Sequence, residues 1–372
     1  MKQWDIFCKV VDNFGDIGVC WRLAKQLVYE HGLQVRMFVD DLKTARQVIP
    51  TLQFTQMQLV EEIEIQHWKT DSTFERAADV VIEAFACELP QDYLSLMSQD
   101  HIWVNLEYLS AEPWVESFHG GNSRFSDTNL KRHFFFPGFG DATGGLLREH
   151  DLLSRRDRFL ATQAQQSLFW QQLGVNQSDS LKISLFNYTH APLSALFHKL
   201  SSDKQKITLL APVNACLQRF SSIFDRSNLA AGDQYSVGSL TLQVLPFLSQ
   251  DDYDKLLWAC DANVVRGEDS WIRAVWAGKP FIWQPYPQTE NTHLAKLNAF
   301  LDAFYVDGGS VKKTIADAHL AWSTGELTNE VLDKYLSELT NIEAITLRQS
   351  GRLAEQTDLA AKLVIFCKNL IT

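Results

Sequence analysis

Short β-rich runs alternate with helical patterns along most of this chain, and no other feature constrains its fold as strongly. Parallel strands need crossover connections, so the alternation predicts an α/β fold with two parallel sheets wrapped by helices. The predicted strands are Trp4–Val11, Gln34–Val39, Val80–Phe85, His101–Asn105 and His133–Phe136 in the first half, and Lys182–Asn187, Lys206–Leu210, Thr241–Leu245, Ala262–Val265 and Pro280–Gln284 in the second.

The predicted helices lie between these strands. The first, Val19–Glu30, carries its apolar residues on one face and is followed by Gly32, a suitable C-cap. The chain from Ile315 to Thr372 has a helical pattern throughout. The remaining predicted helices are Pro90–Gln99, Pro192–Leu200, Asp251–Cys260, Ser270–Ala277 and Asn291–Phe300.

A polar and charged stretch at Thr143–Ser180 interrupts the alternation. A chain of 372 residues is long for one core, so two or three domains are expected. The predicted division is a first domain at residues 1–150, an inter-domain region at 151–180, a second domain at 181–345 and a C-terminal helix at 346–372. That helix can pack back on the first domain.

Charge and cysteine usage narrow the class of protein. A net charge of −11 and a pI near 5.4 leave no basic footprint for nucleic acid or an anionic membrane. The six cysteines form no CxxC pair, so we expect buried free thiols in a reducing compartment. The chain opens into a strand rather than a signal peptide, and no apolar run is long enough to span a bilayer. A cytoplasmic enzyme is therefore expected.

Ligands of parallel sheets bind beyond the carboxyl ends of the strands, so the loops after strands are the candidates for chemistry. The first such loop runs from Asp12 to Gly18 and contains two aspartates, no lysine and no GxGxxG fingerprint. Carboxylates in this loop would repel a phosphate. They can instead act as a general base or bind a cationic group. The alternative, that Asp16 only caps the helix and Asp12 only caps the turn, stays open.

The second candidate loop joins the strand Ala262–Val265 to the helix Ser270–Ala277. Arg266 can bind a phosphate, while Ser270 and the first helical N–H groups offer an anion site. An acidic N-cap with an ion-paired arginine is an equal alternative. Weaker signals at strand ends are the aromatic run Phe186–Tyr188, the segment Pro246–Gln250 and the segment Trp283–Asn291; aromatic residues in such places are more often core.

Three stretches, DNFGDIGVCWRLA, VRGEDSWIRAVWAGKPFIWQPYPQ and SLFNY, resemble the bacterial protein-arginine rhamnosyltransferases that modify elongation factor P, a family of GT-B glycosyltransferases. The resemblance covers essentially the whole chain. It implies two Rossmann-like domains that face each other across a cleft, the first binding the acceptor and the second the nucleotide sugar. It also implies inverting transfer of L-rhamnose from dTDP-β-L-rhamnose to one arginine of elongation factor P, which then rescues ribosomes stalled at polyproline.

The resemblance also assigns residues. It implies catalytic roles for Asp12, Asp16 and Glu268, with Asp16 chosen as the general base and Asp12 as the residue that orients the guanidinium. The acceptor-binding residues implied are Asp12, Asn13, Phe14, Gly15 and Asp16. The dTDP-rhamnose-binding residues implied are Phe186, Tyr188, Phe247, Gln250, Tyr253, Arg266, Glu268, Asp269 and Ser270.

No metal or other cofactor is expected, because Arg266 and the helix N-terminus at Ser270 can stabilise the leaving dTDP, and no DxD metal motif stands at a strand end. The expected partners are elongation factor P and dTDP-rhamnose, with no nucleic acid and no membrane. Two alternatives remain at this point. One is an NAD-dependent oxidoreductase on a similar sheet, and the other is a non-catalytic module that binds an arginine-bearing protein.

Overall fold

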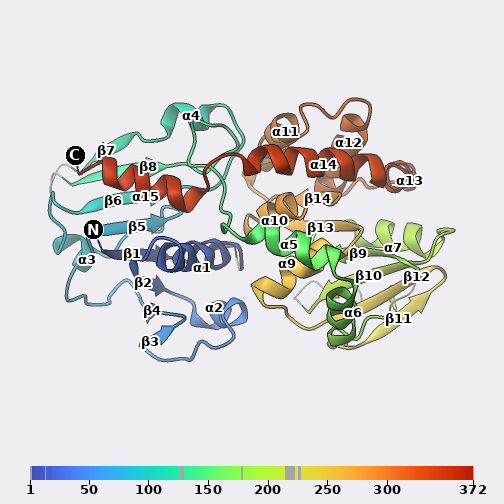
Figure 1. The fold of residues 1–372 in the computed structure, drawn as a ribbon, viewed down its shortest axis with the longest axis horizontal. Helices are drawn as coiled ribbons and strands as arrows, with labels where there is room; N and C mark the ends of the chain where they lie inside the picture. Colours follow the sequence, from blue (N-terminus) through green and yellow to red (C-terminus); the bar gives the residue numbers. More distant parts are fainter. Residues whose placement is uncertain are drawn as a thin grey trace. The chain divides into compact units, whose positions relative to one another are not determined.

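The computed structural model describes residues 2–12, 14–125, 130–176, 179–213, 223–224 and 228–371. The chain divides into two compact units, drawn in Figure 1. The first unit contains Met1–His150 and Leu353–Thr372, and the second contains Asp151–Arg352. The expected inter-domain region at 151–180 is grouped with the second unit, where its helices pack.

The sheet of the first unit has the strand order β3-β4-β2-β1-β5-β6-β8-β7. Its inner strands are parallel, while β3 pairs with β4 and β7 pairs with β8 in antiparallel fashion at the two edges. The carboxyl ends of the parallel strands therefore share one edge. The strands are β1 (Gln3–Cys8), β2 (Gln34–Val39), β3 (Met57–Val60), β4 (Ile63–His67), β5 (Val80–Ala84), β6 (Ile102–Leu106), β7 (Asn122–Arg124) and β8 (Lys131–Phe135).

Apolar side chains cover both faces of this sheet. One face packs against α1 (Phe14–Tyr29) and α15 (Leu359–Asn369), so the last helix of the chain belongs to the first unit's core. The other face carries a cluster rich in aromatic residues, in which the Phe7 and Phe38 rings stack 4.4 Å apart. Shorter helices connect the strands: α2 (Leu42–Val48), α3 (Gln91–Ser95) and α4 (Trp114–Phe118).

The sheet of the second unit has the strand order β11-β12-β10-β9-β13-β14, parallel except for the edge strand β11. Its strands are β9 (Leu181–Leu185), β10 (Ile207–Pro212), β11 (Gln234–Val237), β12 (Leu240–Leu245), β13 (Ala262–Arg266) and β14 (Phe281–Gln284). Its helices are α5 (Leu152–Ala161), α6 (Gln163–Gln172), α7 (Leu193–Ser201), α9 (Gln250–Ala259), α10 (Asp269–Ala277), η2 (Thr289–Asn291), α11 (Thr292–Phe304), α12 (Val311–Thr324), α13 (Asn329–Ser337) and α14 (Leu339–Ala354).

Two buried contacts hold α10 in the second unit. The Trp271 ring stacks on Trp283 of β14 at 3.6 Å, and Arg273 binds the Asp254 carboxylate of α9 through Nη2 at 2.6 Å. Both charged side chains of that pair are almost fully buried, so removal of either would leave an uncompensated charge in the core. The N-terminus of α10 is thereby held at the carboxyl end of β13.

Each of the ten predicted strands overlaps an observed one, and the predicted α/β class is confirmed. Several boundaries differ from the predicted ones; for example, the predicted helix Pro90–Gln99 is the shorter helix α3, Gln91–Ser95, and the predicted strand Lys182–Asn187 is β9, Leu181–Leu185. The first strand ends at Cys8 rather than Val11, because the next backbone N–H groups bind carboxylates instead of a neighbouring strand. The first helix begins at Phe14 rather than Val19. The edge strands β3, β7 and β11 and the inner strand β4 were not predicted, since they are short and partly polar.

The predicted state of the cysteines is confirmed for the described residues: Cys8, Cys20, Cys87, Cys260 and Cys367 are buried free thiols. Cys216 lies outside the described residues. Gly32 ends α1 as predicted: its φ of 65° is left-handed, and its N–H donates to the Val28 carbonyl at 3.0 Å.

Candidate active site

The acidic loop of the first unit is organised around the Asp16 carboxylate. Asp16 lies in the first turn of α1 and is only 2% exposed. Its Oδ2 accepts hydrogen bonds from the N–H groups of Val11 at 2.7 Å and Asp12 at 2.8 Å. The Tyr108 hydroxyl lies 3.3 Å from Oδ1. The side chain thus receives N–H groups that precede the helix, which is not the pattern of an N-cap.

Burial raises the pKa of Asp16 above its ordinary value. The two backbone hydrogen bonds and the Tyr108 hydroxyl oppose this shift, and the nearby Asp40 carboxylate adds to it. Asp40 itself accepts a hydrogen bond from the Val10 N–H at 2.9 Å. A raised pKa makes Asp16 a better proton acceptor than a solvated aspartate, which suits a general base.

Other predicted acceptor residues lie in the same loop. The Asp12 carbonyl accepts a hydrogen bond from the Gly15 N–H at 2.8 Å, which closes the turn. A Cβ at Gly15 would lie 3.0 Å from Asp12 Oδ2, so a larger residue would displace that carboxylate. Phe14 is half-buried against the core. Asn13 lies outside the described residues.

An aromatic pair beside Asp16 was not predicted. The Phe85 and Tyr108 rings stack 4.4 Å apart after the carboxyl ends of the neighbouring strands β5 and β6. Phe85 and Ala86 both have positive φ, 58° and 52°, and the Ala86 N–H donates to Asn105 Oδ1 at 3.0 Å. Strained backbone of this kind concentrates at functional sites. The available signal was position: Phe85 follows β5, which pairs with β1, and Tyr108 follows β6, which pairs with β5.

In the second unit, Arg266 ends β13 and is 9% exposed. Its guanidinium carbon lies 4.5 Å from the centroid of the Phe186 ring and 4.5 Å from that of Tyr188. The structure thus brings three of the predicted donor residues together, and the two rings fix the plane of the guanidinium. A guanidinium held in this way is preorganised for two-point binding of a phosphate.

The turn after Arg266 leads directly into α10. Gly267 has a φ of 63°, which only glycine adopts without strain, and its carbonyl accepts from Trp283 Nε1 at 2.8 Å. The Ser270 hydroxyl accepts from the Arg266 N–H at 3.1 Å and donates to the Arg266 carbonyl. Glu268 and Asp269 are half-buried, and Glu268 makes no side-chain capping hydrogen bond.

The remaining predicted donor residues lie on α9 and on the loop before it. Tyr253 is edge-on to Phe186 at 5.9 Å, and its hydroxyl is buried. Gln250 is buried in the first turn of α9, and Phe247 is half-buried just before it. Together with the Arg266 cluster, these side chains line the carboxyl edge of the second sheet.

Gln284 was not predicted, although the segment that contains it was. Its side chain is fully buried, and Oε1 accepts from the Tyr188 N–H at 2.9 Å. Its Nε2 lies 3.0 Å from the Nε2 of His190, whose ring is parallel to Tyr188. Gln284 therefore fixes the loop that carries Tyr188 beneath Arg266. The sequence offered one signal, a polar amide at the end of the predicted strand Pro280–Gln284.

The described ranges contain no group of three or more His, Cys, Asp or Glu side chains placed to hold a metal ion. Over the same ranges, no helix combines the length and apolarity needed to cross a bilayer.

Comparison with known proteins identifies the family. The family described as "Elongation-Factor P (EF-P) rhamnosyltransferase EarP" matches residues 4–368. A protein-arginine rhamnosyltransferase of Pseudomonas putida is 45% identical, with 98% of each chain covered. One from Pseudomonas aeruginosa is 42% identical, covering 98% of this chain and 99% of the relative.

Solved structures agree. A structure described as the "structural basis for EarP-mediated arginine glycosylation of translation elongation factor EF-P" is 34% identical, with a TM-score of 0.72 and 99% of each chain covered. The spinosyn rhamnosyltransferase SpnG, at 9% identity and a TM-score of 0.53, shares the fold, with 98% of this chain and 99% of that chain covered. The predicted GT-B architecture is confirmed, and the oxidoreductase and non-catalytic alternatives are wrong. The chain is a glycosyltransferase and belongs to the EF-P rhamnosyltransferase EarP family.

Proposed function

We propose that this protein transfers L-rhamnose from dTDP-β-L-rhamnose to an arginine side chain of elongation factor P, with inversion at the anomeric carbon. The relatives' names support the sugar, the arginine and the acceptor protein. The observation in this chain that carries the proposal is the Asp16 carboxylate. It is buried, oriented by two backbone N–H groups, and follows a strand of the first sheet.

The acidic loop is the proposed acceptor site. A guanidinium is cationic at physiological pH and a poor nucleophile, so it needs both a clamp and a proton acceptor. Asp12 supplies the clamp by charge-assisted hydrogen bonds, and Asp16 accepts the proton. The Phe85–Tyr108 stack offers an apolar wall with a hydroxyl edge beside Asp16, against which the guanidinium plane can lie.

The Arg266 cluster is the proposed donor site. Arg266 and the N–H groups at the start of α10 bind the diphosphate, while Phe247 and Tyr253 contact the thymine. Gln250 meets the edge of the base, and Glu268 and Asp269 accept hydrogen bonds from sugar hydroxyls. We propose that Glu268 also positions the rhamnose ring at the reacting carbon.

The proposed step is a single displacement. One terminal nitrogen of the acceptor arginine attacks C1 of rhamnose, and the bond between C1 and the diphosphate oxygen breaks with its electron pair on dTDP. The proton released from the attacking nitrogen passes to Asp16. Arg266 and the N-terminus of α10 stabilise the negative charge that grows on the leaving diphosphate. In other enzymes a bound metal ion can provide this stabilisation. We propose that the reaction needs no metal and no other cofactor.

We place this reaction in the cytoplasm, where translation factors act, and propose that the modified factor rescues ribosomes stalled at polyproline. The direct test mixes the purified protein with dTDP-rhamnose and elongation factor P and weighs the factor by intact mass spectrometry. We expect the factor to gain one deoxyhexose residue on an arginine, and no gain when the donor is omitted. A stable complex without a mass change would reject the proposed activity.

A further inference from the structure

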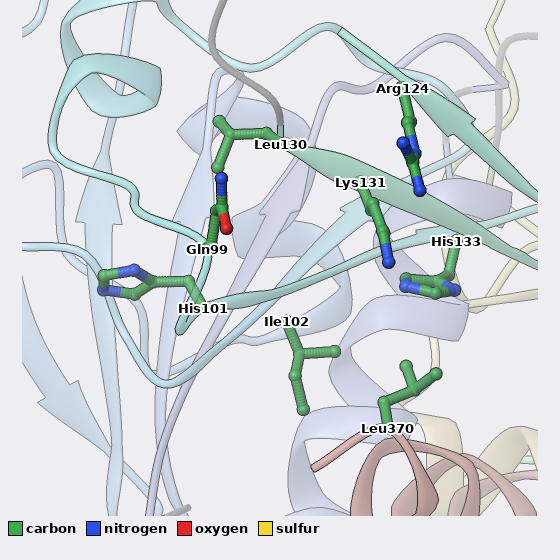
Figure 2. A pocket seen from close by; sticks show the side chains of 8 residues that line it. All are labelled: Gln99, His101, Ile102, Arg124, Leu130, Lys131, His133 and Leu370. Atoms are coloured by element: carbon green, nitrogen blue, oxygen red, sulfur yellow. The ribbon is translucent and has the colours of Figure 1, made fainter.

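A cavity of about 390 Å³ opens in the first unit, away from the acidic loop (Figure 2). Ile102 opens β6 and Lys131 opens β8, and both line the cavity. It therefore lies at the amino ends of these parallel strands, whereas Asp16 and Tyr108 follow the carboxyl ends of their strands. The cavity is distinct from the acceptor site and belongs wholly to the first unit.

The wall of this cavity is basic, although the whole chain carries a net charge of −11. Arg124 and Lys131 are cross-strand partners in the β7–β8 hairpin, so their side chains leave the same face of the sheet. Like charges in directly opposite positions destabilise an antiparallel pair. Within the described ranges neither side chain forms a hydrogen bond or ion pair, and none of the described residues that line the cavity is Asp or Glu.

A histidine ring lies beside the two basic side chains. His133 follows Lys131 by two residues on β8 and so shares its face, as Figure 2 shows. Its Nδ1 is buried and, among the described residues, has no hydrogen-bond partner. The Ile102 and Leu370 side chains supply an apolar floor from β6 and the end of α15. Two cations thus meet over an apolar surface, beside the His133 ring.

From this arrangement we propose that the cavity binds a small phosphate-bearing anion. An arginine fork beside a lysine ammonium is the usual pair of side chains for a phosphate dianion, and the dianion would relieve the repulsion across the hairpin. The volume lies at the lower end of the range for small-ligand sites, so a phosphate leaves room for an organic group over Ile102 and Leu370. A nucleic acid is disfavoured, because its backbone needs a basic track longer than one hairpin.

The test measures thermal unfolding with inorganic phosphate, glucose 6-phosphate or sodium chloride at equal ionic strength. Saturating dTDP is present throughout, so that the donor site is occupied. Phosphate and glucose 6-phosphate should raise the Tm of the wild-type protein above its value in chloride. The larger rise identifies free phosphate or a phosphomonoester as the better ligand. The R124Q/K131Q variant should lose the rise, and calorimetry should show at least about a tenfold weaker Kd.

The matched control is K312Q/K313Q, which removes the same charge from α12 in the second unit. These lysines bind Asp302 and Asp317 at 2.8 Å, so without phosphate this variant should be no more stable than wild type. R124Q/K131Q should be more stable than wild type in low-salt buffer without phosphate, since it removes the cross-strand repulsion. An equal phosphate effect in R124Q/K131Q and wild type overturns the proposal, as does tighter binding of an RNA oligonucleotide than of either phosphate.

Discussion

At the scale of single residues, Asp16 combines three properties that a solvated aspartate lacks: burial, two backbone donors on one oxygen, and a raised pKa. Asn at this position keeps one oxygen that can accept both N–H groups but cannot accept a proton. D16N should therefore lower kcat by roughly 10²–10⁴ and leave the affinity for dTDP unchanged. Rhamnosylation assays and calorimetry measure the two effects, and wild-type turnover in D16N would contradict the role of general base.

The same carboxyl should also shape two pH profiles. Its pKa is raised above 3.8 by burial, so the folded protein binds this proton more tightly than the unfolded chain. As pH rises from 3.8 through the raised value, ionisation in the core costs stability. D16N should therefore gain unfolding free energy relative to wild type over that window, as urea titrations at stepped pH can measure.

The acid limb of kcat/KM should correspondingly have its midpoint above 3.8, because the base must be ionised in the free enzyme. A constant stability difference between D16N and wild type across this window would show that the shift does not belong to Asp16.

Arg266 is the residue on which donor binding should depend most. R266A removes a guanidinium that two aromatic rings hold in place, and both dTDP and dTDP-rhamnose present the diphosphate to it. Both ligands should lose about 2–4 kcal/mol of binding free energy. R155A is the control, since Arg155 forms partly exposed ion pairs with Asp151 and Asp251. Unchanged dTDP affinity in R266A, with an intact circular dichroism spectrum, would assign Arg266 to structure alone.

At the scale of elements, the turn between β13 and α10 decides where the helix N-terminus points. Gly267 adopts a φ of 63° there, and Gly174, after α6, adopts 67° with no atom within 4 Å of an added Cβ. G267A and G174A impose the same backbone strain and should each cost about 1–2 kcal/mol of stability.

Only G267A should weaken dTDP binding, because only its turn orients Arg266 and Ser270. Denaturant unfolding and calorimetry on both variants separate the two effects. Equal dTDP affinity in G267A and G174A would mean that the turn geometry does not organise the donor site.

At the scale of the whole molecule, the proposed sites lie in different units, the acidic loop in the first and the Arg266 cluster in the second. A clamp for one guanidinium is too small to select a protein, so a wider surface of the first unit should recognise the folded acceptor. With a net charge of −11, this enzyme should favour basic residues around the target arginine.

The kcat/KM for intact elongation factor P should therefore fall as salt rises, since screening sets in beyond about 8–10 Å at physiological ionic strength. A short peptide with the target loop should react far more slowly than the folded factor. Equal kcat/KM for peptide and factor would place recognition in the local sequence.

The sequence by itself determined the fold class, the ten strand segments that it predicted and the two loops that carry the proposed chemistry. Its information was local: strand and helix periodicity, the aspartates after β1, and the Arg266 turn before α10. Local signals suffice for such features because a buried parallel strand must be apolar, and a site at its carboxyl end must follow it in the chain.

Only the tertiary structure decided the rest. The edge strands were missed because pairing with a neighbour, not apolar periodicity, makes them strands. Gln284 reaches Tyr188, and Tyr108 reaches Asp16, through contacts between segments far apart in the chain. The basic cavity likewise needs one hairpin and the end of α15 together. These contacts form when segments far apart in the chain pack together. A short stretch of sequence does not show which distant side chains it will contact.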